Sequence, residues 1–170
     1  MTASRKPVRV RPATLEDLPF LMSLSQELKT TRAIGESRLT DAVAAAISDP
    51  DKSLVVAVGG PDDAEEPLGM SLFSLSSANP LFDVPAVHIS HTVVSNRHRR
   101  RGAGRALMAA ATAYADERGI DQLVISVDPG SRESARFFAR LGFVPLAVRR
   151  TAPVALVRRK LSPSASRLRV

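Results

Sequence analysis

The chain has 170 residues, of which 44% are apolar and 24% charged, and its formal net charge is +7. This length suits one domain with a substantial core, and the charge is compatible with an anionic partner. The chain has no cysteine, which excludes disulfides and thiolate chemistry. Its first residues lack an apolar stretch and no apolar run approaches the roughly 18 residues of a membrane span, so we expect neither a secretory signal nor a membrane-spanning helix. A cytoplasmic location is therefore the default expectation.

The first half of the chain predicts two helices and then a pair of strands. "VRVRPA", residues 8–13, alternates apolar and polar side chains and predicts a short strand. Thr14 followed by Asp17 resembles a capping box and predicts a helix to about Lys29. A second helix is expected at about Arg38 to Ser48. Two strands of an antiparallel hairpin follow, separated by a turn rich in Gly and Pro: residues 53–58 and 68–77.

The second half alternates strands with helices. The expected elements are strand 86–94, helix 104–118, strand 121–127, helix 131–141 and the closing strands 143–150 and 154–161. The order βααβββαβαββ predicts a mixed α/β (α+β) fold, whose mostly antiparallel sheet has about seven strands, with about four helices against it. Residues 1–161 are expected to form one domain, and residues 162–170 a disordered tail.

The segment "SNRHRRRGAG", residues 95–104, lies between a predicted strand and a predicted helix. Glycines at such a turn allow close backbone approach, and the helix start offers N–H donors and about half a positive charge. This arrangement suits a pyrophosphate. Two familiar phosphate motifs are rejected, because Leu107 occupies the third small position of a dinucleotide fingerprint and the chain has no Gly-Lys pair for a P-loop.

The same segment resembles motif A of the GNAT superfamily of N-acetyltransferases, Arg/Gln-x-x-Gly-x-Gly/Ala, with Arg99, Gly102 and Gly104 at its fixed positions. Val94 matches the family's strand-end valine. Further along, "SARFFARLGF" resembles motif B, and "VRPATLEDLPFL" is similar to the usual opening of such domains. The resemblance covers about residues 8–161.

This resemblance implies a GNAT-like fold in which strands 86–94 and 121–127 splay apart around acetyl-CoA. Main-chain groups of Thr92, Val93 and Val94 would meet the pantetheine arm. The pyrophosphate would lie among the loop residues Arg99, Arg100, Arg101, Gly102, Ala103, Gly104 and Arg105. Ser131 stands where the family has the asparagine of motif B, and is either a cofactor contact or a plain helix N-cap.

Two departures concern the chemistry. Phe138 replaces the tyrosine that often protonates the departing CoA thiolate in the family, so the acid role is unassigned. Tyr114 is the only tyrosine and has the spacing of a packing residue. His88 lies where several relatives carry a glutamate base, and a histidine pKa suits that duty. Ser126 occupies another base position of some relatives, but cannot act alone.

His91 is the alternative base, on the opposite face of the strand. Alternation places four residues on one face: His88, Ser90, Thr92 and Val94. His91 would face the other way with Ile89 and Val93, unless a bulge breaks the pattern.

The sequence therefore predicts an acetyl-CoA-dependent N-acetyltransferase that acts by direct attack of an amine. The alternative is an acyl-CoA-binding or sensory module with little or no turnover. A nucleic-acid partner is disfavoured, since aromatic residues are only 4% and Trp is absent. No metal site is expected, because the three histidines lack spaced carboxylates. The identity of the acceptor stays open, and we expect it to contact loops 30–37 and 78–85. The oligomeric state stays open as well, with a homodimer as one alternative.

Overall fold

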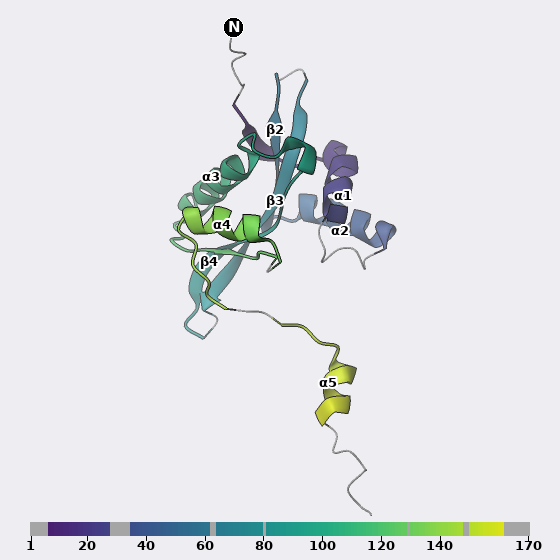
Figure 1. Cartoon of the computed structure of the whole chain (residues 1–170), viewed down its shortest axis with the longest axis vertical. Coiled ribbons are helices and arrows are strands. Elements are labelled where there is room, and N and C mark those ends of the chain that lie inside the picture. The colour runs from purple at the N-terminus through teal and green to yellow at the C-terminus, as the bar shows by residue number, and fades with distance from the viewer. Residues whose placement is uncertain are drawn as a thin grey trace, which may run out of the picture. The chain divides into compact units, whose positions relative to one another are not determined.

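The computed structural model describes residues 7–27, 35–61, 64–79, 81–128, 130–147 and 150–161. The chain divides into two compact units, residues 1–128 and 129–170. Elements of the first unit are β1 (Arg9–Pro12), α1 (Leu18–Glu27), α2 (Glu36–Ser48), β2 (Lys52–Gly59), β3 (Glu66–Asn79), β4 (Val84–Val94), α3 (Ala103–Asp116) and β5 (Leu123–Ile125). The second unit contains α4 (Arg132–Arg140) and α5 (Val154–Leu161) (Figure 1).

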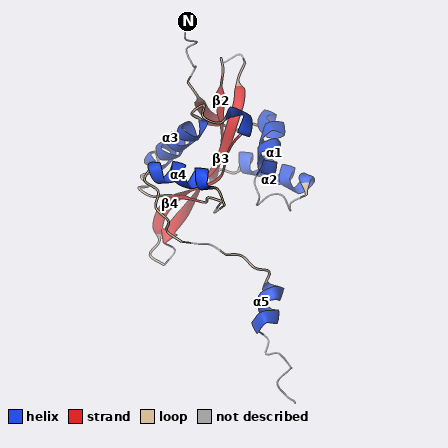
Figure 2. Cartoon of the chain, viewed as in Figure 1, coloured by secondary structure: helices blue, strands red, loops and turns tan. Residues whose placement is uncertain are grey.

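One sheet organises the first unit, with its strands in the order β1-β2-β3-β4-β5. The first four strands pair antiparallel to their neighbours, whereas β5 runs parallel to β4 after the α3 crossover. Figure 2 shows these long central strands with the helices of the same unit, α1, α2 and α3, beside them. The mixed, mostly antiparallel sheet expected from the sequence is thus confirmed, as are the positions of its first five strands along the chain.

Helices cover both faces of this sheet (Figure 1). On one face α1 and α2 pack over a buried cluster formed by Ala13, Leu21, Leu24, Leu54, Val56, Val58, Met70 and Val93. On the other face α3 buries Leu107 and Ala111 against a strand surface that includes Phe73 and Ile89. Apolar side chains at three- and four-residue spacing give each helix its buried side.

The predicted capping box is present at the start of the first helical segment. A short 3-10 helix, Leu15–Asp17, leads into α1, and the Asp17 carboxylate accepts a hydrogen bond of 2.8 Å from the N–H of Thr14. Arg11 on β1 also donates to Asp17, at 2.7 Å. Burial alone would raise the pKa of Asp17, but the hydrogen bonds from Arg11 and Thr14 outweigh it and lower that pKa. This carboxylate therefore joins β1 to the helix start.

The two closing strands predicted from the sequence are wrong. Residues 143–147 have no regular structure, and residues 154–161 form α5 instead of a strand. The C=O of Pro153 accepts hydrogen bonds from Leu156 and Val157, which starts the helix. A short apolar run such as "VALV" does not by itself distinguish helix from strand. The sheet consequently has five strands rather than about seven, and the described chain has five α-helices rather than about four.

Other expectations fall on residues that lie outside the described ranges. These are the last residues of the first predicted helix, the early part of the acceptor loop 30–37 and the tail 162–170. No helix in the described part of the chain is long and apolar enough to cross a membrane.

Candidate functional site

The segment that joins β4 to α3 carries most of the residues singled out from the sequence. β4 ends at Val94, a 3-10 turn spans Asn96–His98, and α3 begins at Ala103. The first bond of α3 runs from the N–H of Ala106 to the C=O of Gly102, at 3.0 Å. The N–H groups of the preceding residues therefore have no acceptor within the helix and are available to an anion at this positive end.

Two residues of this loop adopt a left-handed backbone conformation. Gly102, the N-cap of α3, has φ of +94°, and Arg100 has φ of +63°. A residue with a Cβ is strained at such a φ, so glycine is the natural residue at position 102. Gly104 lies in the first turn of α3. The loop thus brings together the residues Arg99 to Arg105 around a helix start, as the sequence predicts.

The arginine side chains of the loop have different environments. Arg101 turns back to the start of β3, where its guanidinium donates to Glu66 at 2.7 Å and lies 2.9 Å from His98 Nδ1. The hydrogen bond from Arg101 lowers the pKa of Glu66. Arg99, Arg100 and Arg105 are exposed at the helix start. Arg101 therefore anchors the loop to β3, while these others provide accessible positive charge.

A β-bulge interrupts β4 at His91 and Thr92. Leu72 of β3 pairs with Ser90, but Met70 pairs with Val93, so one extra residue is accommodated in β4. His91 has φ of +50°, the left-handed conformation that such irregularities require. Bulges re-aim side chains, and this one changes the expected face of every residue that follows.

The predicted alternation beyond Ser90 is therefore wrong. Directly paired residues share a face, so Val93 lies with Ser90 on the face covered by α1 and α2. Thr92 instead points to the α3 face, where its hydroxyl lies 2.8 Å from that of the fully buried Ser71. Val94, paired with Gly69, follows Thr92 to that face. The bulge, which the sequence leaves open as an alternative, separates Thr92 and Val94 from His88.

Past Ile89, no strand of the described ranges pairs with β4 on the side away from β3, and this part of the strand is its open edge. β5 pairs with β4 only from Val87 to Ile89, and the N–H of Ser126 then donates to the C=O of Ile89 at 3.1 Å. The N–H of Ser95 bonds to Leu68 on β3, at 2.9 Å. Backbone groups of successive strand residues point to opposite sides, so Val94 directs its N–H and C=O to the side where β5 has already ended.

Gly69 allows the close approach of β3 to this end of β4. A Cβ at position 69 would lie 2.6 Å from the carbonyl oxygen of Val93 and 3.1 Å from Cα of Val94. No heavier residue fits there without moving one strand. The sequence patterns did not predict the roles of three features: Gly69, the Ser71–Thr92 pair and Glu66. For Gly69, a glycine inside a predicted strand was the available signal.

His88 lies at the paired end of β4. Its Nε2 is 2.7 Å from the hydroxyl of Ser126, the residue that follows β5. The structure therefore brings together two base positions that lie 38 residues apart in the sequence. His91 is exposed at the bulge, with Nδ1 3.1 Å from the Ser90 hydroxyl. Desolvation of the ring lowers the pKa of His91, even though much of the residue is exposed.

In the second unit, Ser131 is the N-cap of α4. Its hydroxyl oxygen accepts from the N–H of Ser134 at 3.2 Å, and it donates to the Ser134 hydroxyl at 2.8 Å. The N-cap role expected of Ser131 is thus present, and its contact with the cofactor stays a prediction. Phe138 is buried, with the rings of Phe137 and Phe143 at 5.0 and 5.7 Å from its own. It belongs to an aromatic cluster and has no proton to donate.

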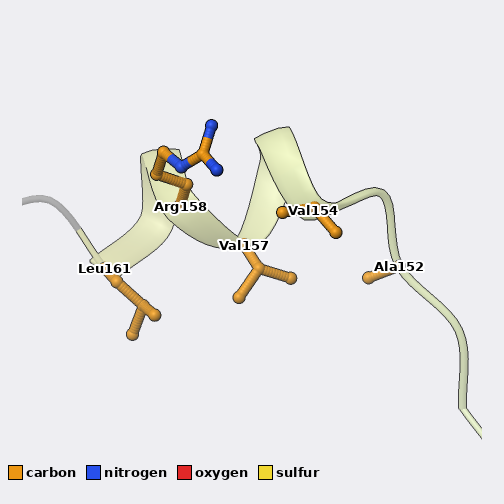
Figure 3. A pocket seen from close by; sticks show the side chains of 5 residues that line it. All are labelled: Ala152, Val154, Val157, Arg158 and Leu161. Atoms are coloured by element: carbon orange, nitrogen blue, oxygen red, sulfur yellow. The ribbon is translucent and has the colours of Figure 1, made fainter.

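The remaining features add no reactive group. Tyr114 packs against Phe73, with ring centroids 5.7 Å apart, and beneath the guanidinium of Arg118, as expected of a packing residue. Among the residues that the structure describes, no group of His, Asp and Glu could hold a metal ion. A shallow hollow on α5 is lined by Ala152, Val154, Val157, Arg158 and Leu161 (Figure 3). It contains none of the residues predicted for the site.

The sequence of the chain matches the model of a known protein family. The model of the acetyltransferase (GNAT) family matches residues 20–143, which is most of the chain. The chain belongs to the GNAT acetyltransferase family. It is accordingly an acetyltransferase by family, and members use acetyl-CoA as the acetyl donor. No curated protein matches the chain significantly.

Solved structures share the fold of this GNAT protein at low sequence identity. A transcriptional regulator from Bacillus halodurans C-125 is 22% identical, with a TM-score of 0.72 over 86% of this chain and 99% of its own. Glucosamine-6-phosphate N-acetyltransferase from Arabidopsis thaliana is 14% identical, with a TM-score of 0.67 over 88% and 99%. A predicted acetyltransferase from Clostridium acetobutylicum, solved with acetyl-CoA, is 13% identical, with a TM-score of 0.65 over 88% and 98%.

Proposed function

We propose that this chain is an N-acetyltransferase that transfers the acetyl group of acetyl-CoA directly to an amine. The observation that carries the proposal is the juxtaposition of an open β4 edge with the helix start at Gly102. An extended cofactor with amide groups at one end and a pyrophosphate at the other needs those two kinds of surface. The family assignment supports the same donor.

Binding of the donor is assigned to main-chain groups. The open edge around Thr92 to Val94 would bond the pantetheine amides, and the N–H groups from Gly102 to Arg105 would hold the pyrophosphate. Arg99 and Arg100 add exposed positive charge. Main-chain donors at a helix start are fixed before the ligand arrives, so they lose little conformational freedom on binding.

The chemistry requires removal of a proton from the acceptor. An ammonium has no free lone pair, so the amine must be neutral before its nitrogen attacks the thioester carbonyl carbon. As the C–N bond forms and the C–S bond breaks, the nitrogen loses a proton and the CoA thiolate leaves. We assign the general base to His88. Phe138 can supply no acid, and the thiolate leaves without a side-chain donor at that position.

Thermal unfolding tests the donor site directly. Acetyl-CoA should raise Tm, because a ligand that binds only the folded state stabilises it. Dephospho-CoA should keep much of the increase, whereas pantetheine, which lacks the pyrophosphate, should lose most of it. Equal increases in Tm with CoA and pantetheine would contradict a pyrophosphate site at Gly102.

The alternative function is an acyl-CoA-binding or sensory module with little turnover. Phe138 favours it, because the residue is buried among aromatic rings and cannot protonate a thiolate. A screen of amines that follows release of free CoA separates the two functions. Amino-sugar phosphates belong in this panel, since the Arabidopsis neighbour acts on glucosamine 6-phosphate. Tight CoA binding with no release across the panel would support the module.

A further inference from the structure

The contact between His88 and Ser126 joins two strands that are far apart in the sequence. His88 pairs with Val124 in the parallel β4–β5 register, and Ser126 follows two residues later on the same face. The register therefore brings the serine hydroxyl to 2.7 Å from His88 Nε2. This distance is a short hydrogen bond between a hydroxyl and a ring nitrogen.

The two partners differ in their access to solvent. Ser126 is exposed at the point where β5 ends, whereas His88 is only partly exposed on the preceding strand. The backbone bond from Ser126 to Ile89 ties the serine to β4 just before the open edge begins. Of the two contacting residues, Ser126 is therefore the more accessible to a molecule from solvent.

We infer that Ser126 is a further catalytic residue, whose hydroxyl takes the proton of the acceptor amine and passes its own proton to His88. This inference rests on the proposed function. In the step, the amine N–H bond breaks as a new O–H bond forms at Ser126 Oγ. The original O–H bond breaks as Nε2 gains its proton, so Ser126 is unchanged and His88 becomes an imidazolium. No acetyl group is transferred to Ser126, so the step involves no acyl-enzyme intermediate and no deacylation.

The relay requires one arrangement of hydrogens before reaction. Ser126 must donate to Nε2, so the neutral His88 ring carries its proton on Nδ1. The opposite arrangement, with Nε2–H donating to the serine, would leave Nε2 unable to accept a proton. The tautomer of His88 therefore distinguishes a serine that can pass a proton to Nε2 from one that accepts a hydrogen bond from Nε2–H.

Nitrogen-15 NMR of the histidine side chains in the ligand-free protein tests this requirement without any acceptor or donor. The chain has three histidines, and the His88→Gln variant identifies the signals of His88 by their absence. We expect the Nδ1–H form of His88 in the native chain and in Ser126→Thr, and a shift toward Nε2–H in Ser126→Ala. A His88 ring that holds Nε2–H in both native and Ser126→Ala protein would overturn the inference.

Ser90→Ala is the matched control, because Ser90 makes a similar contact with His91, 3.1 Å away. It should alter only the His91 signals. If acetyl-CoA raises Tm but His88 carries its proton on Nε2, the relay is contradicted and the proposed function stands. If His88 carries its proton on Nδ1 but acetyl-CoA does not bind, the proposed donor site is contradicted instead.

Two measurements separate the relay from other roles of the serine. Intact-protein mass spectrometry after incubation with acetyl-CoA alone should show no added acetyl group; acetylation at Ser126 would overturn the relay in favour of a nucleophile. With an amine found by the CoA-release screen, Ser126→Ala should lower kcat about tenfold or more with the KM for acetyl-CoA unchanged. Adding Ser126→Ala to His88→Gln should cause no further loss, because both substitutions break the same path. If the two substitutions lower kcat independently of each other, the relay is contradicted.

Discussion

The two halves of β4 have different surroundings, although they belong to one continuous strand. From Val84 to Ile89 the strand is held by β3 on one side and, at its end, by β5 on the other. From Ser90 to Val94 it keeps β3, loses β5 and contains the bulge at His91. In the first half, backbone N–H and C=O groups form hydrogen bonds within the sheet. In the second half, the backbone groups on the side away from β3 can bind a ligand.

This difference shows how one strand can serve both stability and binding. Where both edges are paired, a side chain such as His88 has a defined position. Where one edge is open, the bulge turns Thr92 and Val94 to the α3 face, and the main chain itself becomes the binding surface. Substitutions in each half should therefore change different properties, and the following four test that division.

The largest effect is expected for His88, in the paired half. His88→Gln should lower kcat/KM about 10²-fold or more, the usual contribution of a positioned base. The Kd for acetyl-CoA should not change, because the main chain of the other half binds the donor. Steady-state kinetics and isothermal titration calorimetry measure the two quantities. His91→Asn is the control, chosen because asparagine tolerates the left-handed backbone at the bulge. It should keep nearly full activity, and full activity in His88→Gln would remove His88 from the mechanism.

Gly69 faces the open half from β3. Gly69→Ala should lower the free energy of unfolding by about 1–3 kcal/mol, a typical effect of overpacking, because its Cβ meets the Val93 carbonyl. Urea unfolding measures this change. Gly35→Ala, whose Cβ meets nothing within 4 Å, is the matched control and should lose less than about 1 kcal/mol. Equal losses in both variants would show that the β3–β4 approach tolerates a side chain.

Gly104 tests the helix start that follows the open half. Gly104→Val should weaken CoA binding at least tenfold, about 1.4 kcal/mol, because the side chain blocks close approach to the N–H groups. Ala113→Val places the same β-branched residue on the exposed side of α3 and should leave Kd within about twofold. Unchanged CoA affinity in a folded Gly104→Val protein would place the cofactor elsewhere.

The smallest effect is expected at the bulge itself. Thr92→Val removes the partner of the buried Ser71 hydroxyl and should lower the free energy of unfolding by about 1 kcal/mol. Adding Ser71→Ala should restore part of that loss, since no buried polar group then lacks a partner. A double-mutant cycle with no coupling energy would mean that this hydrogen bond does not hold the bulge.

Local patterns predicted much of this architecture. The strand, glycine loop and helix over residues 86–118 were predicted within two residues at each boundary that the structure describes. The capping box at Thr14 was also predicted, and so was the packing role of Tyr114. Each depends on neighbours in sequence or on the period of one element. The predicted strand at 154–161 failed because a short apolar run carries no decisive period.

Sequence by itself determined the positions of the first five strands along the chain, the helix start at Gly102 and the family that motif A implies. Only the tertiary structure decided the face of Thr92, the approach of β3 at Gly69 and the contact of His88 with Ser126. The physical reason is the register of strand pairing. One extra residue in β4 reverses the direction of every side chain beyond it, and the register with β5 sets which distant residue meets His88. No local sequence pattern predicts the extra residue in β4 or the β4–β5 register, because both depend on contacts between residues far apart in the chain.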